Sequence, residues 1–311
     1  MLQLRVVSPV DRRQALDELL DAQQAVCNIV ILAGAAHRPS GDVVTFDVAR
    51  EAANEVLDAL RALDLHIDGS ITINPIAASL SVSAQMAEDA APGDPSEAVV
   101  WEEVEARVRH DASLSLSFVT FMVLAVLIAA VGIVTDSPIL IVGAMVVGPE
   151  FGPIAGMMLA ILKRRRDRFV TSFTALVAGF GAAVAVAFLF GLCLRVFDRM
   201  PASYVLGDRP LTTFISRPDL FAVIVAIAAA IAGAMSLTES RAGPLVGVFI
   251  SVTTIPAAAG LGLAIATARW SEAGGSALQL LVNIASLVLV GAAALHVKFR
   301  LWPSHPHPSP R

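Results

Sequence analysis

The first 83 residues alternate between strand-like runs, in which every second residue is apolar, and amphipathic helical segments. The pattern predicts strands over residues 2–7, 26–32, 43–48 and 69–74, and helices over 12–23 and 52–63. The turn signal Arg38-Pro39-Ser40-Gly41 joins the second and third strands as a hairpin. This order is that of the ferredoxin-like βαββαβ sandwich, so we expect residues 1–83 to form a four-stranded sheet with two helices on one face.

Residues 84–112 follow a different pattern. Small and polar residues dominate 84–96, which is typical of a linker. Residues 97–110 predict an amphipathic helix, because Val100, Val104 and Val108 recur every four residues. Two placements fit this helix: at the membrane interface with Trp101 as an anchor, or packed on the soluble domain.

Long apolar runs dominate the chain from residue 113 to residue 300. A helix needs about 20 apolar residues to cross the hydrocarbon of a bilayer. Six segments meet that length: 114–134, 138–162, 169–194, 219–237, 243–267 and 276–297. We therefore expect an α+β protein, with a cytosolic domain over 1–83, a polytopic helical membrane domain of about six helices over 113–300, and a flexible tail over 301–311.

The distribution of arginine sets the expected orientation. Residues 163–168 carry five positive charges in six residues, which places this loop in the cytosol by the positive-inside rule. The N-terminus lacks the pattern of a signal peptide, which agrees with a cytosolic first domain. An even helix count returns the C-terminus to the same side of the cell (inner) membrane. The outer loop 195–218 also holds four arginines, so the orientation depends mainly on the cluster at 163–168.

The second and fifth apolar segments have prolines near their middles, and each is the middle member of a three-helix set. Pro149, Pro153 and Pro256 remove backbone donors, and such breaks persist at membrane depth only where protein or a wet cavity satisfies the freed groups. Because three is odd, the second set runs opposite to the first. This predicts an inverted 3+3 repeat whose discontinuous helices, broken near Gly148–Pro153 and Thr253–Pro256, form a site near the bilayer midplane.

Glu150 is the charged residue nearest the middle of these spans. A carboxylate at that depth costs at least about 2.5 kcal/mol, which favours an ion, proton or substrate ligand over a carboxylate that only buttresses a turn. The candidate binding residues are Gly148, Pro149, Glu150, Gly152, Pro153, Thr253, Thr254 and Pro256, with Asp136, Glu239 and Asn283 as secondary candidates.

Composition and charge support this division. The chain is 56% hydrophobic and 16% charged, whereas soluble domains have about 25% charged residues. Residues 1–112 carry a net charge of −11, which excludes a nucleic-acid-binding face. Two cysteines in different halves give no disulfide framework, and no catalytic or nucleotide motif is present, so no cofactor is expected.

Four stretches of sequence resemble a known family. They are Gly41-Asp-Val-Val with Asp47-Val-Ala-Arg50-Glu-Ala-Ala-Asn54-Glu-Val, then Gly69-Ser70-Ile71, then Ile141-Val-Gly-Ala-Met, and Gly152-Pro153. Together they are similar to the prokaryotic membrane family named domain of unknown function 389, over residues 1–300. The resemblance implies a multi-spanning membrane protein and supplies no substrate. Many members have an apolar pair where this chain has Glu150-Phe151, so a role of Glu150 would not be family-wide.

These observations favour a small-solute or ion transporter or channel, with the soluble domain as a regulatory or oligomerisation module. One alternative is a membrane-embedded enzyme that uses the carboxylates of Asp136, Glu150 and Glu239, which could hold a metal ion. The other is a sensor or scaffold with a dry interior. The edge strands of the sheet lead us to expect a homo-oligomer, and the other expected partner is the lipid bilayer.

Both termini are expected in the cytosol. A C-terminal fusion to a reporter that is active only inside the cell should therefore be active, because six crossings return the chain to its starting side. A reporter that is active only outside the cell, fused at the same residue, serves as the control. Activity of that second fusion alone would contradict the predicted topology.

Overall fold

The computed structural model describes residues 1–91, 93, 98–207, 209–212, 215, 220–238 and 254–301. They fall into two compact parts: a sheet unit over residues 1–104, and a helical unit over residues 105–237 and 241–301.

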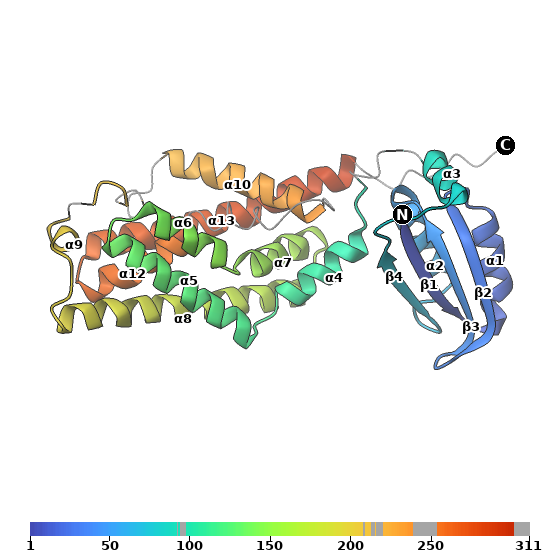
Figure 1. Cartoon of the computed structure of the whole chain (residues 1–311), viewed down its shortest axis with the longest axis horizontal. Helices are drawn as coiled ribbons and strands as arrows, with labels where there is room; N and C mark the ends of the chain where they lie inside the picture. Colours follow the sequence, from blue (N-terminus) through green and yellow to red (C-terminus); the bar gives the residue numbers. More distant parts are fainter. Residues whose placement is uncertain are drawn as a thin grey trace. The chain divides into compact units, whose positions relative to one another are not determined.

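The sheet unit is built on four antiparallel strands, β1 (Leu2–Ser8), β2 (Val26–His37), β3 (Ser40–Val48) and β4 (Ser70–Pro75), as Figure 1 shows. Their order in the sheet is β2-β3-β1-β4, and every neighbouring pair is antiparallel. The four-stranded antiparallel sheet predicted from the sequence is therefore confirmed.

Alternation along the strands creates the core of this unit. Leu2, Leu4 and Val6 of β1 are fully buried, and Val44 and Phe46 of β3 are buried beside them. The core is completed by helices α1 (Arg13–Asp21) and α2 (Ala53–Ala62), which follow the short 3₁₀ turns η1 (Val10–Arg12) and η2 (Arg50–Ala52). One apolar face on each helix and one on the sheet therefore meet, as the two periodicities require.

Two parts of the sheet unit differ from the sequence prediction. Strand β2 continues five residues beyond residue 32, and its edge-strand residues Val30, Ile31 and Leu32 are 44–54% exposed. Residues 84–90, expected to be linker, lie in helix α3 (Val82–Ala90). The Ser81 hydroxyl accepts a hydrogen bond from the Ala84 N–H at the start of this helix, a cap that a linker-like composition conceals.

The sequence predicts a helix over residues 97–110, and the structure contains helix α4 over Trp101–Asp111. Val100, just before the helix, is buried in the core of the sheet unit. The first turn of α4 forms ion pairs with this unit: Glu103 with Arg50, and Glu102 with Arg61, each at 2.8 Å. Of the two placements expected from the sequence, the first turn of α4 therefore has the second, in which it packs on the soluble domain.

Among the described residues of the helical unit, four helices are long and apolar enough to cross a membrane. They are α5 (Leu116–Val134), α8 (Arg166–Val196), α10 (Leu220–Thr238) and α13 (Trp270–Leu301). A fifth span is formed if α6 (Pro138–Val147) and α7 (Phe151–Leu162), bent by 56° at their junction, count as one. Helix α12 (Thr254–Ala266) is too short to span alone, and α9 (Ala202–Leu206) is a single turn. The first half of the fifth predicted segment, residues 243–253, lies outside the described residues.

The two short helices α7 and α12 form the centre of the helical unit. Residues 153–160 of α7 are all buried, and ten of the thirteen residues of α12 are buried. Helix α12 packs against α5, α8 and α13, and α7 packs against α8 and α13. A helix that is apolar on all sides belongs in the interior, and both sequences have that character.

Close packing of α8 and α12 depends on Gly262. A Cβ at this residue would lie 2.5 Å from the Ala187 Cβ and 2.7 Å from the Val184 carbonyl oxygen. We expect Gly262→Ala to lower the free energy of unfolding by about 1–3 kcal/mol, because the two backbones must separate. Thermal unfolding in detergent measures the change. Gly181→Ala on α8 is the control, since nothing lies within 4 Å of its added Cβ, and equal melting temperatures for both variants would contradict this packing.

Candidate functional site

The second apolar segment is broken where the sequence predicts. Helix α6 ends at Val147 and α7 begins at Phe151. Pro149 has no N–H for the carbonyl four residues earlier, so the α-helical ladder stops. The sequence assigned Pro153 to the break. The structure instead places it in the first turn of α7, where a missing N–H costs nothing.

The Glu150 carboxylate lies at this break, just before the first residue of α7. Its side chain is 0% exposed, and its Oε1 accepts a hydrogen bond of 2.7 Å from the Thr254 hydroxyl. Thr254 is the first residue of α12. Gly148 makes room for this contact, because a Cβ there would lie 2.5 Å from the Glu150 Oε2 and 2.9 Å from Ile255. The sequence placed Glu150 and Thr254 in one candidate set, and the structure brings them into direct contact.

Helices α7 and α12 start at this contact and run in opposite directions. Three residues separate the end of α7 from the start of α8. Helix α12 ends at the opposite end of α8, where Arg195 donates a hydrogen bond of 3.1 Å to the Ala266 carbonyl. Glu150 immediately precedes α7, although its side chain makes no capping hydrogen bond to that helix, and its carboxylate contacts Thr254 in the first described turn of α12. Each N-terminus carries a partial positive charge of about 0.5, which stabilises a negative charge between them.

Helix α13 carries a row of buried polar side chains, the polar stripe, that extends to the level of Glu150 in the bundle. Ser276, Gln279 and Asn283 are at most 4% exposed and share one helical face, and Gln279 donates to Asn283 at 3.3 Å. Ser276 Oγ and Gln279 Oε1 have no hydrogen-bond partner in the part of the chain that the structure describes. Of these three residues, only Asn283 was predicted from the sequence, although three polar residues at helical spacing in an apolar run were the available signal.

Two packed helices fix the depth of Asn283. Gly291 of α13 contacts Met158 of α7, and these two helices run in the same direction. Asn283 and Glu150 each lie eight residues before that contact, or about 12 Å along the helix axis. Asn283 and Glu150 are therefore at the same height in the bundle.

The other carboxylates do not join this site. Asp136 lies at the opposite end of the ten-residue helix α6, about 15 Å from the break, and it accepts a hydrogen bond of 2.8 Å from Thr212. Glu239 and Thr253 lie outside the described residues. No group of three His, Cys, Asp or Glu side chains suited to a metal ion occurs among the residues that are described.

The arginines of the predicted outer loop have structural partners that the sequence analysis missed. Glu272, in the first turn of α13, pairs with Arg209 at 2.7 Å and with Arg269 at 2.8 Å. Both guanidinium groups lie over the ring of Tyr204 in α9, and burial raises the pKa of its phenol. Of the four arginines in the expected outer loop 195–218, Arg195 therefore binds a helix end and Arg209 pairs with a carboxylate.

The fold and the site together define an α+β protein whose apolar helices are compatible with a membrane protein, with a buried carboxylate at a helix break. Comparison with known sequences confirms the family resemblance. The family model described as "Domain of unknown function (DUF389)" matches residues 145–289, which include the break, Glu150 and Thr254.

The chain is also similar to "Uncharacterized protein MJ0678" of Methanocaldococcus jannaschii. The two sequences are 26% identical over 212 residues, which cover 66% of this chain and 63% of that protein. The chain therefore aligns with less than two thirds of the length of that relative. No solved structure matches the chain.

The hydroxyl of Thr254 is expected to stabilise the buried carboxylate. Thr254→Val should lower the free energy of unfolding by about 1–3 kcal/mol, because a hydrogen bond to a buried charged group is lost. Thr254→Ser keeps the donor and should lose much less. Thermal unfolding in detergent compares the two variants, and a loss in Thr254→Ser as large as that in Thr254→Val would contradict a leading role of the hydroxyl.

Proposed function

We propose that this chain is a transporter or channel for a small solute or an ion, in the cell (inner) membrane with both termini in the cytosol. The observation that carries the proposal is the fully buried Glu150 carboxylate, placed halfway along a broken span where two half-helices begin. Among the described residues from 113 to 162, Asp136 and Glu150 are the only charged residues, and Asp136 lies at a helix end. Intramembrane carboxylates mark ion and substrate pathways.

The chemistry of the site favours an exchangeable ligand. The two helix N-termini and the Thr254 hydroxyl stabilise a negative charge, which Glu150 supplies when it is ionised. When Glu150 takes up a proton, the same donors become available to a solute oxygen or an anion. Binding at this site should therefore depend on pH, and a proton is the natural coupling ion.

The polar stripe on α13 supplies a route between this site and the end of the bundle that carries Glu272. Ser276 lies one turn beyond Glu272, and Asn283 lies level with Glu150. Polar atoms that are buried without a protein partner bind water or a solute in most proteins. These side chains support an aqueous path along one helix face rather than a dry interior.

An inverted repeat is supported by a constant shift of 104 residues between the two helix sets. Gly156 of α7 contacts Ser172 of α8, and Gly260 of α12 contacts Ser276 of α13. Both helices end with the same cap: the Arg165 N–H donates to the Ala160 carbonyl, and the Arg269 N–H donates to the Ala264 carbonyl. The residues before these arginines, Arg164 and Ala268, both have positive φ.

Contacts between the two sets obey the same shift. Met158 of α7 contacts Gly291 of α13, and Gly262 of α12 contacts Ala187 of α8. Adding 104 to the residue numbers of Met158 and Ala187 gives those of Gly262 and Gly291. The shift therefore relates the Met158–Gly291 contact to the Gly262–Ala187 contact, with the two helix sets exchanged. A pseudo-two-fold axis in the membrane plane produces such an exchange, and this architecture places substrate sites at discontinuous helices. The proposal keeps the six crossings expected from the sequence, of which residues 243–253 lie outside the described part of the chain.

For the sheet unit we propose a ferredoxin-like fold and a role in oligomerisation. The strand order β2-β3-β1-β4, with both helices contributing to one core, supports the fold. The edge strand β2 exposes Val30 at 52% and Leu32 at 54%, and exposed apolar edge strands pair readily with a second copy.

The two rival functions have weaker support. A membrane-embedded enzyme would need a second catalytic group beside Glu150, and Asp136 is one helix length away. A sensor or scaffold needs no buried carboxylate and no polar stripe. The polar groups at the level of Glu150 therefore favour transport over both.

Access of water to the break tests the proposal without knowledge of the solute. In a background without Cys27 and Cys193, Thr254→Cys in native membranes should react with a small charged thiosulfonate, although Thr254 is 0% exposed in this structure. Transport requires that the site open to water at some stage. Ala130→Cys in α5, also 0% exposed, is the matched control and should stay unmodified. Protection of both thiols would favour the scaffold.

The role of Glu150 is tested by the pH dependence of the same reaction. The Thr254→Cys rate, corrected by that of an exposed thiol in Leu116→Cys, should change with pH as Glu150 exchanges its proton. Glu150→Gln should abolish this change while Thr254→Cys remains accessible. An unchanged pH profile would leave the broken-helix site in place and remove Glu150 as its proton ligand.

A further inference from the structure

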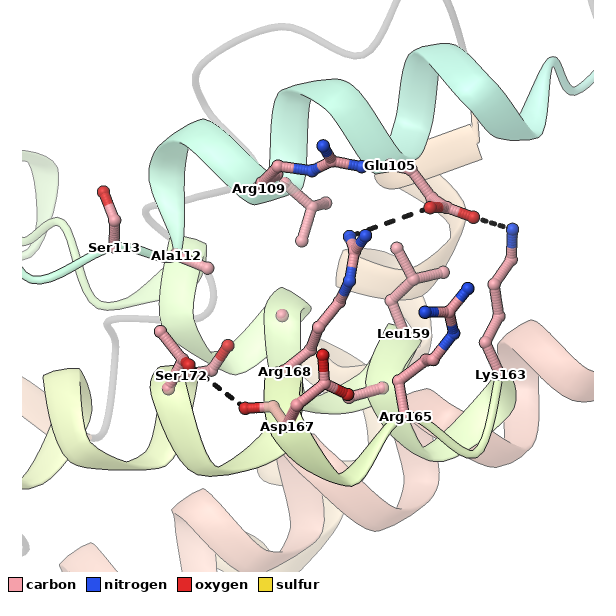
Figure 2. A pocket seen from close by; sticks show the side chains of 14 residues that line it. Glu105, Arg109, Ala112, Ser113, Leu159, Lys163, Arg165, Asp167, Arg168 and Ser172 are labelled. Carbon is pink, nitrogen blue, oxygen red and sulfur yellow. Dashed lines mark hydrogen bonds and ion pairs between the residues drawn. The ribbon is translucent and has the colours of Figure 1, made fainter. Parts of the chain in front are cut away.

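A cavity of about 280 Å³ lies inside the helical unit, away from the Glu150 break. It is enclosed by the last two turns of α4, the end of α7, the α7–α8 connection and the first turns of α8 (Figure 2). At about 30 Å³ for each water molecule, it holds a group about as large as nine waters. None of the residues predicted to bind a solute lines it.

The lining has two chemical parts. Val108, Ala112, Leu159 and Ala160 supply apolar lining, here called the floor, and Ser113, Thr171 and Ser172 add hydroxyl groups. The rim carries four cationic side chains and two carboxylates, a net charge of +2, and its members are Glu105, Arg109, Lys163, Arg165, Asp167 and Arg168. A cavity with an apolar floor and a cationic rim fits an amphiphile with an anionic head.

Two of the four cations remain available to a ligand. Glu105 is bound by Lys163 and, at 3.7 Å, by Arg168, and Figure 2 shows these two side chains converging on it. Arg109 and Arg165 have no ion pair or hydrogen bond from their side chains to any residue that the structure describes. A guanidinium group presents a planar fork of donors that matches a phosphate oxygen pair.

The surroundings favour a membrane lipid over a soluble anion. Ile161, Val170 and Phe173, on the same turns of α7 and α8, are 40–56% exposed apolar residues. If the helical unit spans the bilayer as proposed, these side chains face acyl chains beside the cavity, at the basic end where headgroups lie. Basic pockets between helices at the cytosolic face bind anionic lipid headgroups.

We propose that this cavity binds the phosphate group of an anionic phospholipid, with Arg109 and Arg165 as its ligands. The phosphate lies at the rim between the two guanidinium groups, and the glycerol part of the lipid rests on the apolar floor. The bound lipid connects the end of α4 to the start of α8. Neither the transport role nor the protonation of Glu150 is needed for this site.

Thermal unfolding of the full-length protein in an uncharged detergent tests the proposal. Phosphatidylglycerol should raise the melting temperature of the wild type more than phosphatidylcholine does. In Arg109→Gln/Arg165→Gln the concentration of phosphatidylglycerol for half the shift should rise by on the order of tenfold or more, because two charge-assisted contacts are lost. The control, Arg107→Gln/Arg164→Gln, removes two exposed arginines from the same elements that do not line the cavity, and it should behave as the wild type.

Two results would overturn the proposal. If both double variants respond alike to phosphatidylglycerol, the lipid effect depends on overall charge and not on the cavity. If sodium phosphate or glycerol 3-phosphate alone reproduces the full shift, the ligand is a soluble phosphate compound rather than a lipid. Should the double variant fail to fold, the single variants Arg109→Gln and Arg165→Gln are compared by lipid retention in native mass spectrometry, where each should retain less phosphatidylglycerol than wild type.

Discussion

A carboxylate buried among apolar helices is the constraint on which the helical unit depends. Placing a charge at the centre of a bilayer costs at least about 2.5–3.5 kcal/mol. A helix N-terminus can return up to about 2 kcal/mol in a partly buried geometry, and a hydrogen bond to a charged group about 1.5–3 kcal/mol. If the helical unit spans the bilayer as proposed, the Thr254 hydroxyl and the nearby helix starts act against the cost of an ionised Glu150. The dependence is mutual, because without the carboxylate two positive helix ends would face each other.

The break has consequences for the packing around it. Helices α7 and α12 are each too short to cross a bilayer, so longer helices must enclose them and satisfy their ends. Small residues permit this: Gly156, Gly262 and Gly291 each lie where a Cβ would collide with a neighbouring helix. Apart from Glu150, the charged side chains discussed above lie at helix ends, where Arg195 caps α12 and Glu272 neutralises two arginines.

Local signals in the sequence predicted most of the elements but few of the contacts. Alternation predicted the sheet, and Gly148 with Pro149 predicted the break, because both depend on neighbouring residues. The pairing of Glu150 with one particular threonine joins residues 104 apart, and no local pattern carries that information. The buried cluster around Tyr204 was missed for the same reason. Pro153 was assigned to the break, yet it occupies the first turn of α7, where proline is favoured by its fixed φ. The residues before Thr254 lie outside the described part of the chain, so the break near Pro256 stays a prediction.

The proposed repeat also explains why its two halves differ at the site. Residues close to a pseudo-two-fold axis meet their own counterparts, and a shift of 104 makes Thr254 the counterpart of Glu150. Two identical carboxylates in that position would repel each other, and one would have to hold a proton. Replacing one by threonine converts the repulsion into a donor–acceptor pair. The sequences of the two halves must therefore diverge at the axis, while the glycine, serine and cap residues farther from it can stay alike.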